Sequence, residues 1–224
     1  MKNQIQHTCH ISNHTILIDG QVIYRASSEN DLSVFLTELY RYLKIDYAKF
    51  FKMDTLSKLA FLATELLVGQ INQDYYDKNE IGIVLGNRSS SILSDFIHQK
   101  SIQNPVEHFP SPAVFVYTLP NIMMGEICIR HGFSNENTLF ISNKFDTDLL
   151  EKYTNYLLNE LIVKECICGW IDAHADNYEA FFYFVSPRNS QSMGEHCSEN
   201  IQNLRTINYQ QKPKKLQEIE SLLI

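Results

Sequence analysis

Apolar residues recur along the chain at two spacings, which predict helices alternating with strands. Between residues 32 and 43 they lie three and four positions apart, as on one face of a helix, and Asp31 precedes them as a candidate cap. A second helix is expected over residues 53–68. This stretch has an acidic residue near its start, and Gly69 follows its last residue. The uninterrupted apolar run at residues 81–86 shows no alternation, so it fits a strand covered on both faces.

The N-terminal part predicts a strand pair, and the later part predicts further strands separated by helices. Residues 9–18 and 21–24 flank Asp19-Gly20, a sequence typical of a tight hairpin turn. Together the patterns give five expected strands, near Ile11, Ile81, Leu139, Cys166 and Phe182. Strands interleaved with helices predict an α/β fold, here a mixed five-stranded sheet covered by helices on both faces.

Length and composition favour a single core. A chain of 224 residues with 44% hydrophobic residues can bury one good core. From residue 187 onward the composition becomes polar, apart from a short amphipathic end at residues 214–223. We therefore expect one domain over residues 1–186 and a polar C-terminal tail over residues 187–224.

Charge and hydropathy argue against several classes of partner. The net charge of −7 and the pI near 5.6 disfavour nucleic-acid binding, which needs lysine and arginine to displace counterions. The sequence has no run of about 18 apolar residues, and its first residues lack a signal-peptide pattern. The expectation is a cytoplasmic protein with no nucleic-acid partner and no membrane insertion.

The five cysteines are odd in number and show no disulfide-framework spacing, which predicts reduced thiols. Cys166 and Cys168 are two residues apart in a strand-like run, so both should point to the same face of the sheet. A metal site would need two more ligands, and the available His174 and His196 follow no ligand pattern. Buried thiols are the favoured interpretation, and neither a metal nor another cofactor is expected.

A segment in the middle of the chain carries the most specific motifs. Residues 110–133 begin with Pro-Ser-Pro, continue with a Pro-Asn pair that opens an expected helix, and end in Gly-Phe. This segment resembles the stretch of β-ketoacyl synthases that leads into their nucleophile elbow. Residues 166–173 similarly match the synthase strand that ends in Gly-Gly-Val-Asp-Ala. The resemblance extends over about residues 53–173 and implies the N-terminal half of a thiolase-type fold.

The same register places Lys144 where the synthases carry their nucleophilic cysteine. After Gly132, a short strand at residues 138–142 leads to Asn-Lys-Phe-Asp at residues 143–146, in place of a Thr-Ala-Cys-Ala type turn. A helix N-terminus stabilises a thiolate, whereas a lysine there places a cation against the positive end of the helix and cannot form a thioester. The second half of full synthases, with its two histidines, has no counterpart in these 224 residues. No catalytic residue is therefore expected, and Lys144 marks a degenerate nucleophile position.

Chain-length factors, the inactive partners of ketosynthases, share an elbow without its nucleophile. Half-length members that accompany the ketosynthases of aryl polyene and flexirubin-type pigments resemble this chain. The resemblance implies a non-catalytic subunit that pairs along its edge strand with a full-length β-ketoacyl-ACP synthase in polyene or fatty-acid-type elongation, with acyl carrier protein as an indirect partner. The residues expected at the acyl tunnel or the interface are Phe96, Ile97, Tyr117, Met123, Met124 and Leu139. For the first five, ordinary core packing is the alternative interpretation.

Two other functions stay open at the level of the sequence. One is an enzyme with divergent acyl-transfer chemistry at Lys144, Asp146 and His131, because a desolvated lysine is a nucleophile. The other is a stand-alone homodimer that binds an acyl chain or a carrier protein without turnover. A full-length ketosynthase gene next to the gene for this chain would favour the ketosynthase-partner function over both.

Overall fold

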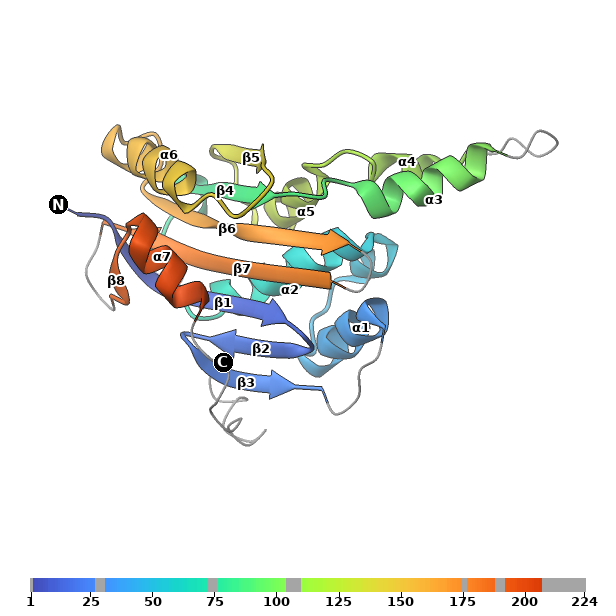
Figure 1. Ribbon diagram of the computed structural model, residues 1–224, viewed down its shortest axis with the longest axis horizontal. Coiled ribbons are helices and arrows are strands. Elements are labelled where there is room, and N and C mark those ends of the chain that lie inside the picture. Colours follow the sequence, from blue (N-terminus) through green and yellow to red (C-terminus); the bar gives the residue numbers. More distant parts are fainter. Residues whose placement is uncertain are drawn as a thin grey trace.

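The computed structural model describes residues 2–26, 31–71, 76–103, 110–174, 177–187 and 192–206. Within these ranges the chain forms a mixed sheet flanked by helices, with the strand order β3-β2-β1-β7-β6-β4-β5 (Figure 1). The short strand β8 pairs with β1 outside this path, which makes eight strands. The five expected strands are all present, as β1, β4, β5, β6 and β7, but the expected strand number of five is wrong.

The strand directions define the two ends of the sheet. Parallel pairing joins β4 to both β5 and β6, whereas all other pairs are antiparallel. The strands are β1 (Gln4–Ser12), β2 (Thr15–Ile18), β3 (Gln21–Arg25), β4 (Ile81–Asn87), β5 (Asn137–Ile141), β6 (Glu165–His174), β7 (Asn177–Ser186) and β8 (Gly194–Glu195). Within the described part of the chain, β3 and β5 are the outermost strands and each leaves one edge unpaired.

The N-terminal region is a three-stranded meander, where the sequence pattern predicted a strand pair. Asn13 and His14 have φ angles of 45° and 53°, so a tight turn divides the expected first strand into β1 and β2. The predicted turn at Asp19-Gly20 is present, with φ angles of 50° and 75°. The first turn was missed because Asn-His lacks the glycine that usually marks such turns.

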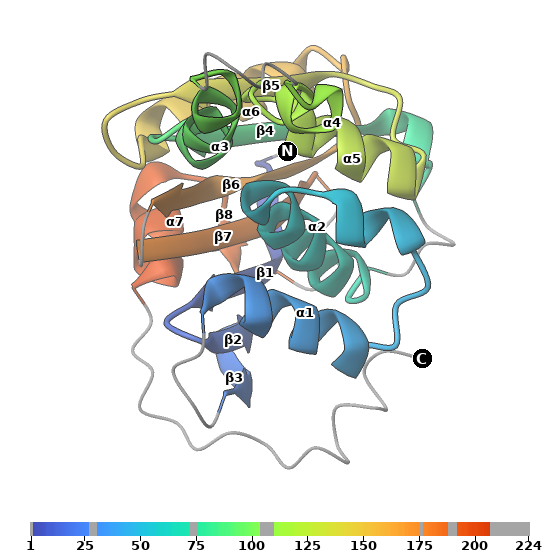
Figure 2. The ribbon, with the colours of Figure 1, turned by 90° about the vertical axis from the view of Figure 1, so that its right-hand side faces the viewer.

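Helices cover both faces of the sheet, as expected. Figure 2 shows α1, α2 and α5 on one side of the strands and α6 and α7 on the other. The helices are α1 (Leu32–Tyr42), α2 (Thr55–Val68), α3 (Ile92–Ile102), α4 (Pro112–Val116), α5 (Ile122–His131), α6 (Thr147–Asn159) and α7 (Ser198–Arg205). Asp31 and Asp54 cap α1 and α2 by accepting hydrogen bonds from the backbone N–H groups of Ser33 and Ser57. Among the helices described, none is long and apolar enough to span a membrane.

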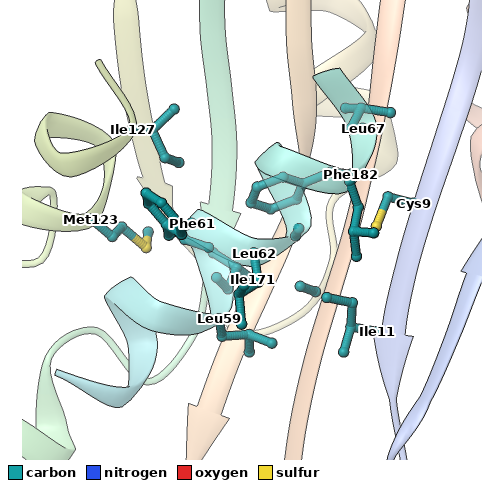
Figure 3. Packing of buried hydrophobic residues seen from close by; sticks show 14 of the residues in the cluster. Cys9, Ile11, Leu59, Phe61, Leu62, Leu67, Met123, Ile127, Ile171 and Phe182 are labelled. Atoms are coloured by element: carbon teal, nitrogen blue, oxygen red, sulfur yellow. The ribbon is translucent and has the colours of Figure 1, made fainter. Parts of the chain in front are cut away.

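Two apolar cores lie on the two faces of the sheet. In the first, α2 is buried around most of its circumference, and Met123 and Ile127 of α5 lie beside Phe61 of α2 (Figure 3). All three of these side chains are fully buried. The second core lies beneath α6 and α7 and includes Leu157 and Ile201. Strand β4 is buried at every position between the two cores, as its unbroken apolar run predicted.

The folded unit continues beyond the expected boundary at residue 186. Strand β8 pairs with β1, and Ile201 of α7 is fully buried in the second core. The expected polar tail is therefore wrong for residues 192–206, where one apolar side chain per helical turn was too weak a signal to predict a packed helix. The expected amphipathic end at residues 214–223 lies outside the described residues.

Candidate functional site

Lys144 lies in the loop that joins the edge strand β5 to α6. The loop is attached to β4, because the Ser142 N–H donates to the Asn87 carbonyl oxygen at 2.9 Å. Within the loop, the Ser142 hydroxyl donates to the Lys144 carbonyl oxygen at 2.8 Å. Asp146 caps α6 by accepting a hydrogen bond from the Leu149 N–H at 3.0 Å. These bonds fix the loop geometry and leave the Lys144 side chain exposed.

Lys144 lines an open cavity of about 650 Å³. The walls come from the loops after β4 and β5, from the sheet strands β1, β6 and β7, and from the end of α7. Charged and aromatic side chains among the lining residues include Arg88, Lys144, Phe145, Trp170, Asp172, Glu179 and Arg205. We call this cavity the elbow pocket.

Asp172 forms the first polar cluster of the elbow pocket. It stands near the end of β6, and its Oδ1 accepts a hydrogen bond from the Ser89 N–H at 2.8 Å. Its Oδ2 accepts from the Ser89 hydroxyl and from Arg88 Nη2, both at 3.1 Å. Asp172 thereby orders the turn that follows β4.

Glu179 forms the second polar cluster. His10 Nε2 lies 2.9 Å and Arg205 Nε lies 2.8 Å from its Oε1, while Arg205 Nη2 donates to Oε2. Burial alone would raise the pKa of the Glu179 carboxyl, but the bonds and charges of Arg205 and His10 outweigh it and lower the pKa to about 2. The Arg205 guanidinium also lies 5.0 Å above the ring of Phe145. Arg205 thus connects the end of α7 to the sheet through Glu179 and to the loop after β5 through Phe145.

The residues expected at an acyl tunnel have three different environments. Phe96 and Ile97 on α3 are each 56% exposed. Tyr117 is buried, and its hydroxyl donates to Glu126 Oε1 at 3.0 Å. Burial, followed by the charge of Glu126, raises the pKa of this hydroxyl, so it stays protonated.

The two methionines and Leu139 lie on the core side of their elements. Met123 and Met124 are at most 1% exposed and belong to the first core, while Leu139 of β5 is half-buried against the same core. These positions are compatible with either a packing role or a wall one layer behind a tunnel, so the tunnel assignment stays a prediction.

The structure does not bring His131 and Lys144 together. Lys144 follows the end of β5 that is bonded to Asn87, whereas His131 shares a cavity with Ile81 at the opposite end of β4. A strand of this length separates its two ends by roughly 20 Å at about 3.3 Å per residue. His131 instead lies with its Nε2 atom 3.2 Å from Glu65 Oε1. An acyl-transfer site that combines these two residues has no geometric support.

The paired cysteines are buried on one face of β6, as the spacing indicated. Cys166 and Cys168 are fully buried, and Cys168 Sγ lies 3.2 Å from the Thr154 hydroxyl oxygen. Burial raises the pKa of Cys166 far above its usual range, which keeps it a thiol. Among the described residues, no group of three or more His, Cys, Asp or Glu side chains is placed to hold a metal ion.

Comparison with known proteins finds similarity in structure but not in sequence. No protein-family model and no curated protein sequence matches the chain. Solved structures do match, among them three with probability 1.00. The first, described as the ishigamide ketosynthase/chain length factor, gives a TM-score of 0.61 at 14% identity over 85% of this chain. The chain has the ketosynthase fold.

Two further structures with the ketosynthase fold agree with the first. One is a complex of a type II polyketide synthase acyl-carrier protein with its ketosynthase, AntDE:AntF, at TM-score 0.58, 15% identity and 84% of this chain. The other is the ketosynthase ApeO in complex with its chain length factor ApeC from Xenorhabdus doucetiae, at TM-score 0.55, 10% identity and 92% of this chain. Thiolase-like architecture, with a mixed sheet between helices, is therefore confirmed.

The matches differ in how much of the known protein is covered. This chain spans 63% of the ishigamide-system chain and 62% of the AntDE:AntF chain, but 92% of the matched chain in the ApeO/ApeC complex. A ketosynthase-fold chain of this length thus exists within a known two-subunit assembly.

Several residues of the elbow pocket were not predicted from the sequence. Asp172, Glu179 and Arg205 meet there although 33 positions separate the first from the last. The available signal was the hairpin of β6 and β7, which sets Asp172 directly opposite Glu179. Arg205 gave no signal, because its helix was not expected.

Proposed function

We propose that this chain is a non-catalytic subunit, similar to a chain-length factor, that pairs with a full-length β-ketoacyl-ACP synthase. The observation that carries the proposal is Lys144, which presents an exposed amine at the loop where the resembling enzymes hold a thiolate. An amine cannot carry an acyl chain as a thioester. In this proposal the partner ketosynthase catalyses chain elongation. Acyl carrier protein is then an indirect partner of this subunit, because it binds to the assembled pair.

The surface proposed for pairing lies at the β5 end of the sheet. Strand β5 is outermost, and Ile141 at its end is 53% exposed. Figures 1 and 2 both place α3 and α4 at this same end. Five large apolar side chains are exposed on these helices and just after them: Phe96, Ile97, Phe115, Val116 and Leu119. An unpaired strand edge beside exposed apolar side chains favours a protein partner.

The two helices are held in a defined position, which a specific interface requires. The Ser91 hydroxyl donates to the Thr118 carbonyl oxygen at 2.7 Å, so the start of α3 is attached to the segment after α4. The rings of His98 and Phe115 lie 5.4 Å apart between the helices. We call the exposed surface of β5, α3 and α4 the pairing face.

The product class is proposed from the sequence resemblance: a polyene of the aryl polyene or flexirubin type. In the proposed pair, Phe96 and Ile97 contribute to the tunnel wall from the pairing face. Met123 and Met124 then set the wall shape from the core behind it.

The test is co-expression of this chain with the full-length ketosynthase encoded nearest to its gene, followed by affinity capture and size exclusion. The wild-type chain should elute with the ketosynthase as a heterodimer. Ile141→Arg and Phe115→Asp each place a charge on the pairing face and should abolish co-elution. Val34→Arg, at a 46% exposed position on α1, is the matched control and should leave pairing intact. Leu139 is avoided because it packs against the core.

Two results would redirect the assignment. If the wild-type chain forms only a homodimer that Ile141→Arg dissociates, the pairing face serves a second copy of this chain. If mass spectrometry finds an acyl group on Lys144 after incubation with acylated carrier protein, the chain is an acyl-transfer enzyme.

A further inference from the structure

The elbow pocket takes no part in the pairing proposed above, and its charge is opposite to that of the chain. The whole sequence has a net charge of −7. Among the described residues that line the pocket, Arg88, Lys144 and Arg205 are cationic, and only Asp172 and Glu179 are acidic. The pocket therefore carries an excess of positive charge in an acidic protein.

Every oxygen of the two acidic groups already accepts a hydrogen bond from a protein group. The two oxygens of Asp172 accept hydrogen bonds from Ser89 and Arg88. The two oxygens of Glu179 accept from Arg205, and one of them also lies at bonding distance from His10. Each carboxylate oxygen is thus engaged with at least one protein donor, whereas two cationic side chains of the pocket keep most of their own donors available.

The remaining donors belong to Lys144 and Arg88. Within the described residues, no carboxylate lies at ion-pair distance from Lys144, whose ammonium has three N–H bonds to offer. Arg88 reaches Asp172 only through Nη2, and its side chain is 52% exposed, which leaves other guanidinium N–H groups available. An arginine and a lysine that line one cavity can bind phosphate and carboxylate groups.

We propose that the elbow pocket binds a small molecule through an oxyanion group, a phosphate or a carboxylate, held by Lys144 and Arg88. Its volume of about 650 Å³ suits a small molecule. The rings of Phe145 and Trp170, 5.8 Å apart, form an apolar wall for the rest of the ligand. Lys144, at the position where the resembling synthases carry their acyl-accepting cysteine, then provides a site for non-covalent binding in place of a site for covalent attachment.

The protein contains a natural probe of this pocket. Trp170 is the only tryptophan in the sequence, and it lines the cavity. The full-length chain is titrated at constant ionic strength with inorganic phosphate, pyrophosphate or acetate, and the fluorescence of Trp170 is recorded. Potassium chloride is the control for ionic strength. At least one oxyanion should give a saturable change and raise the thermal unfolding midpoint.

Matched lysine variants assign the effect to the pocket. Lys144→Gln should weaken oxyanion binding at least about tenfold, the order expected for losing one charge-assisted hydrogen bond. Lys152→Gln removes the same charge from an exposed position on α6 outside the pocket and should leave the affinity unchanged. The phosphate and acetate arms then tell which oxyanion the ligand carries.

The proposal is wrong if none of the three oxyanions changes either the fluorescence or the unfolding midpoint beyond the chloride control. It is equally wrong if Lys144→Gln binds as tightly as the wild type. Neither result depends on a ketosynthase, so failure here leaves the pairing proposal untouched.

Discussion

Gly169 in β6 lies where the backbones of β6 and β7 approach too closely for any side chain. A Cβ atom at this position would lie 2.2 Å from the Phe181 carbonyl oxygen and 2.9 Å from the Phe182 Cα. Its φ angle of +157° is also one that residues with a side chain rarely adopt. Gly169→Ala therefore forces the two central strands apart.

The size of the loss follows from these contacts. Separating the strands at the Gly169–Phe182 pair weakens about two ladder hydrogen bonds, each worth about 1 kcal/mol. Backbone strain adds about 1–3 kcal/mol. The expected loss in the free energy of unfolding is about 3–5 kcal/mol, a large share of the 5–15 kcal/mol typical of a domain.

The assay is urea denaturation followed by far-ultraviolet circular dichroism. Gly125→Ala is the control, because a Cβ there meets no atom within 4 Å and α5 gains a better helix former, worth about 0.5–1 kcal/mol of added stability. A Gly169→Ala protein that loses less than about 1 kcal/mol would refute this steric argument.

Two further predictions concern the cores. Met123→Ala should lower the free energy of unfolding, measured by urea denaturation, by about 2–4 kcal/mol because the side chain is fully buried in the first core. If the same variant leaves the product distribution of the reconstituted pair unchanged, Met123 contributes only to core packing. Burial lowers the pKa of His196 to about 4 from an ordinary value of 6.5. As the pH falls from 6.5 to 4, His196 therefore becomes protonated in the unfolded chain but stays neutral in the folded chain. The free energy of unfolding of the wild type should therefore drop by up to about 3 kcal/mol between pH 6.5 and pH 4. If His196 is the cause, the unfolding midpoints of the wild type and of His196→Gln should converge as the pH is lowered across this range.

Periodicity predicted the elements whose burial is regular. The buried strand β4 and the capped helix α2 were expected at nearly their observed bounds, because an unbroken apolar run and an N-terminal Asp54 are local signals. The Asn13-His14 turn and α7 were missed because their signals are weak: a turn without glycine, and a helix with a single buried apolar residue, Ile201.

The candidate site was predictable only where it is continuous in sequence. Lys144 was singled out from its register in a continuous motif, and the loop that contains it lies between the expected strand β5 and the expected helix α6. The side chains that shape the elbow pocket meet only because distant strands pair. The pairing of β1 with β7, for example, brings the His10 ring to the Glu179 carboxylate. No local pattern carries that information.

The position of β1 has a consequence for how the chain folds as it is made. Strand β1 lies between β2, which follows it after a two-residue turn, and β7, which begins at Asn177. On a ribosome, the N-terminal meander can therefore form early, yet β1 keeps an open edge until more than 160 further residues have been synthesised. Contacts of such long range form slowly, and an open edge invites pairing with other chains. Nascent chains of this protein should consequently depend on chaperones until β7 is released.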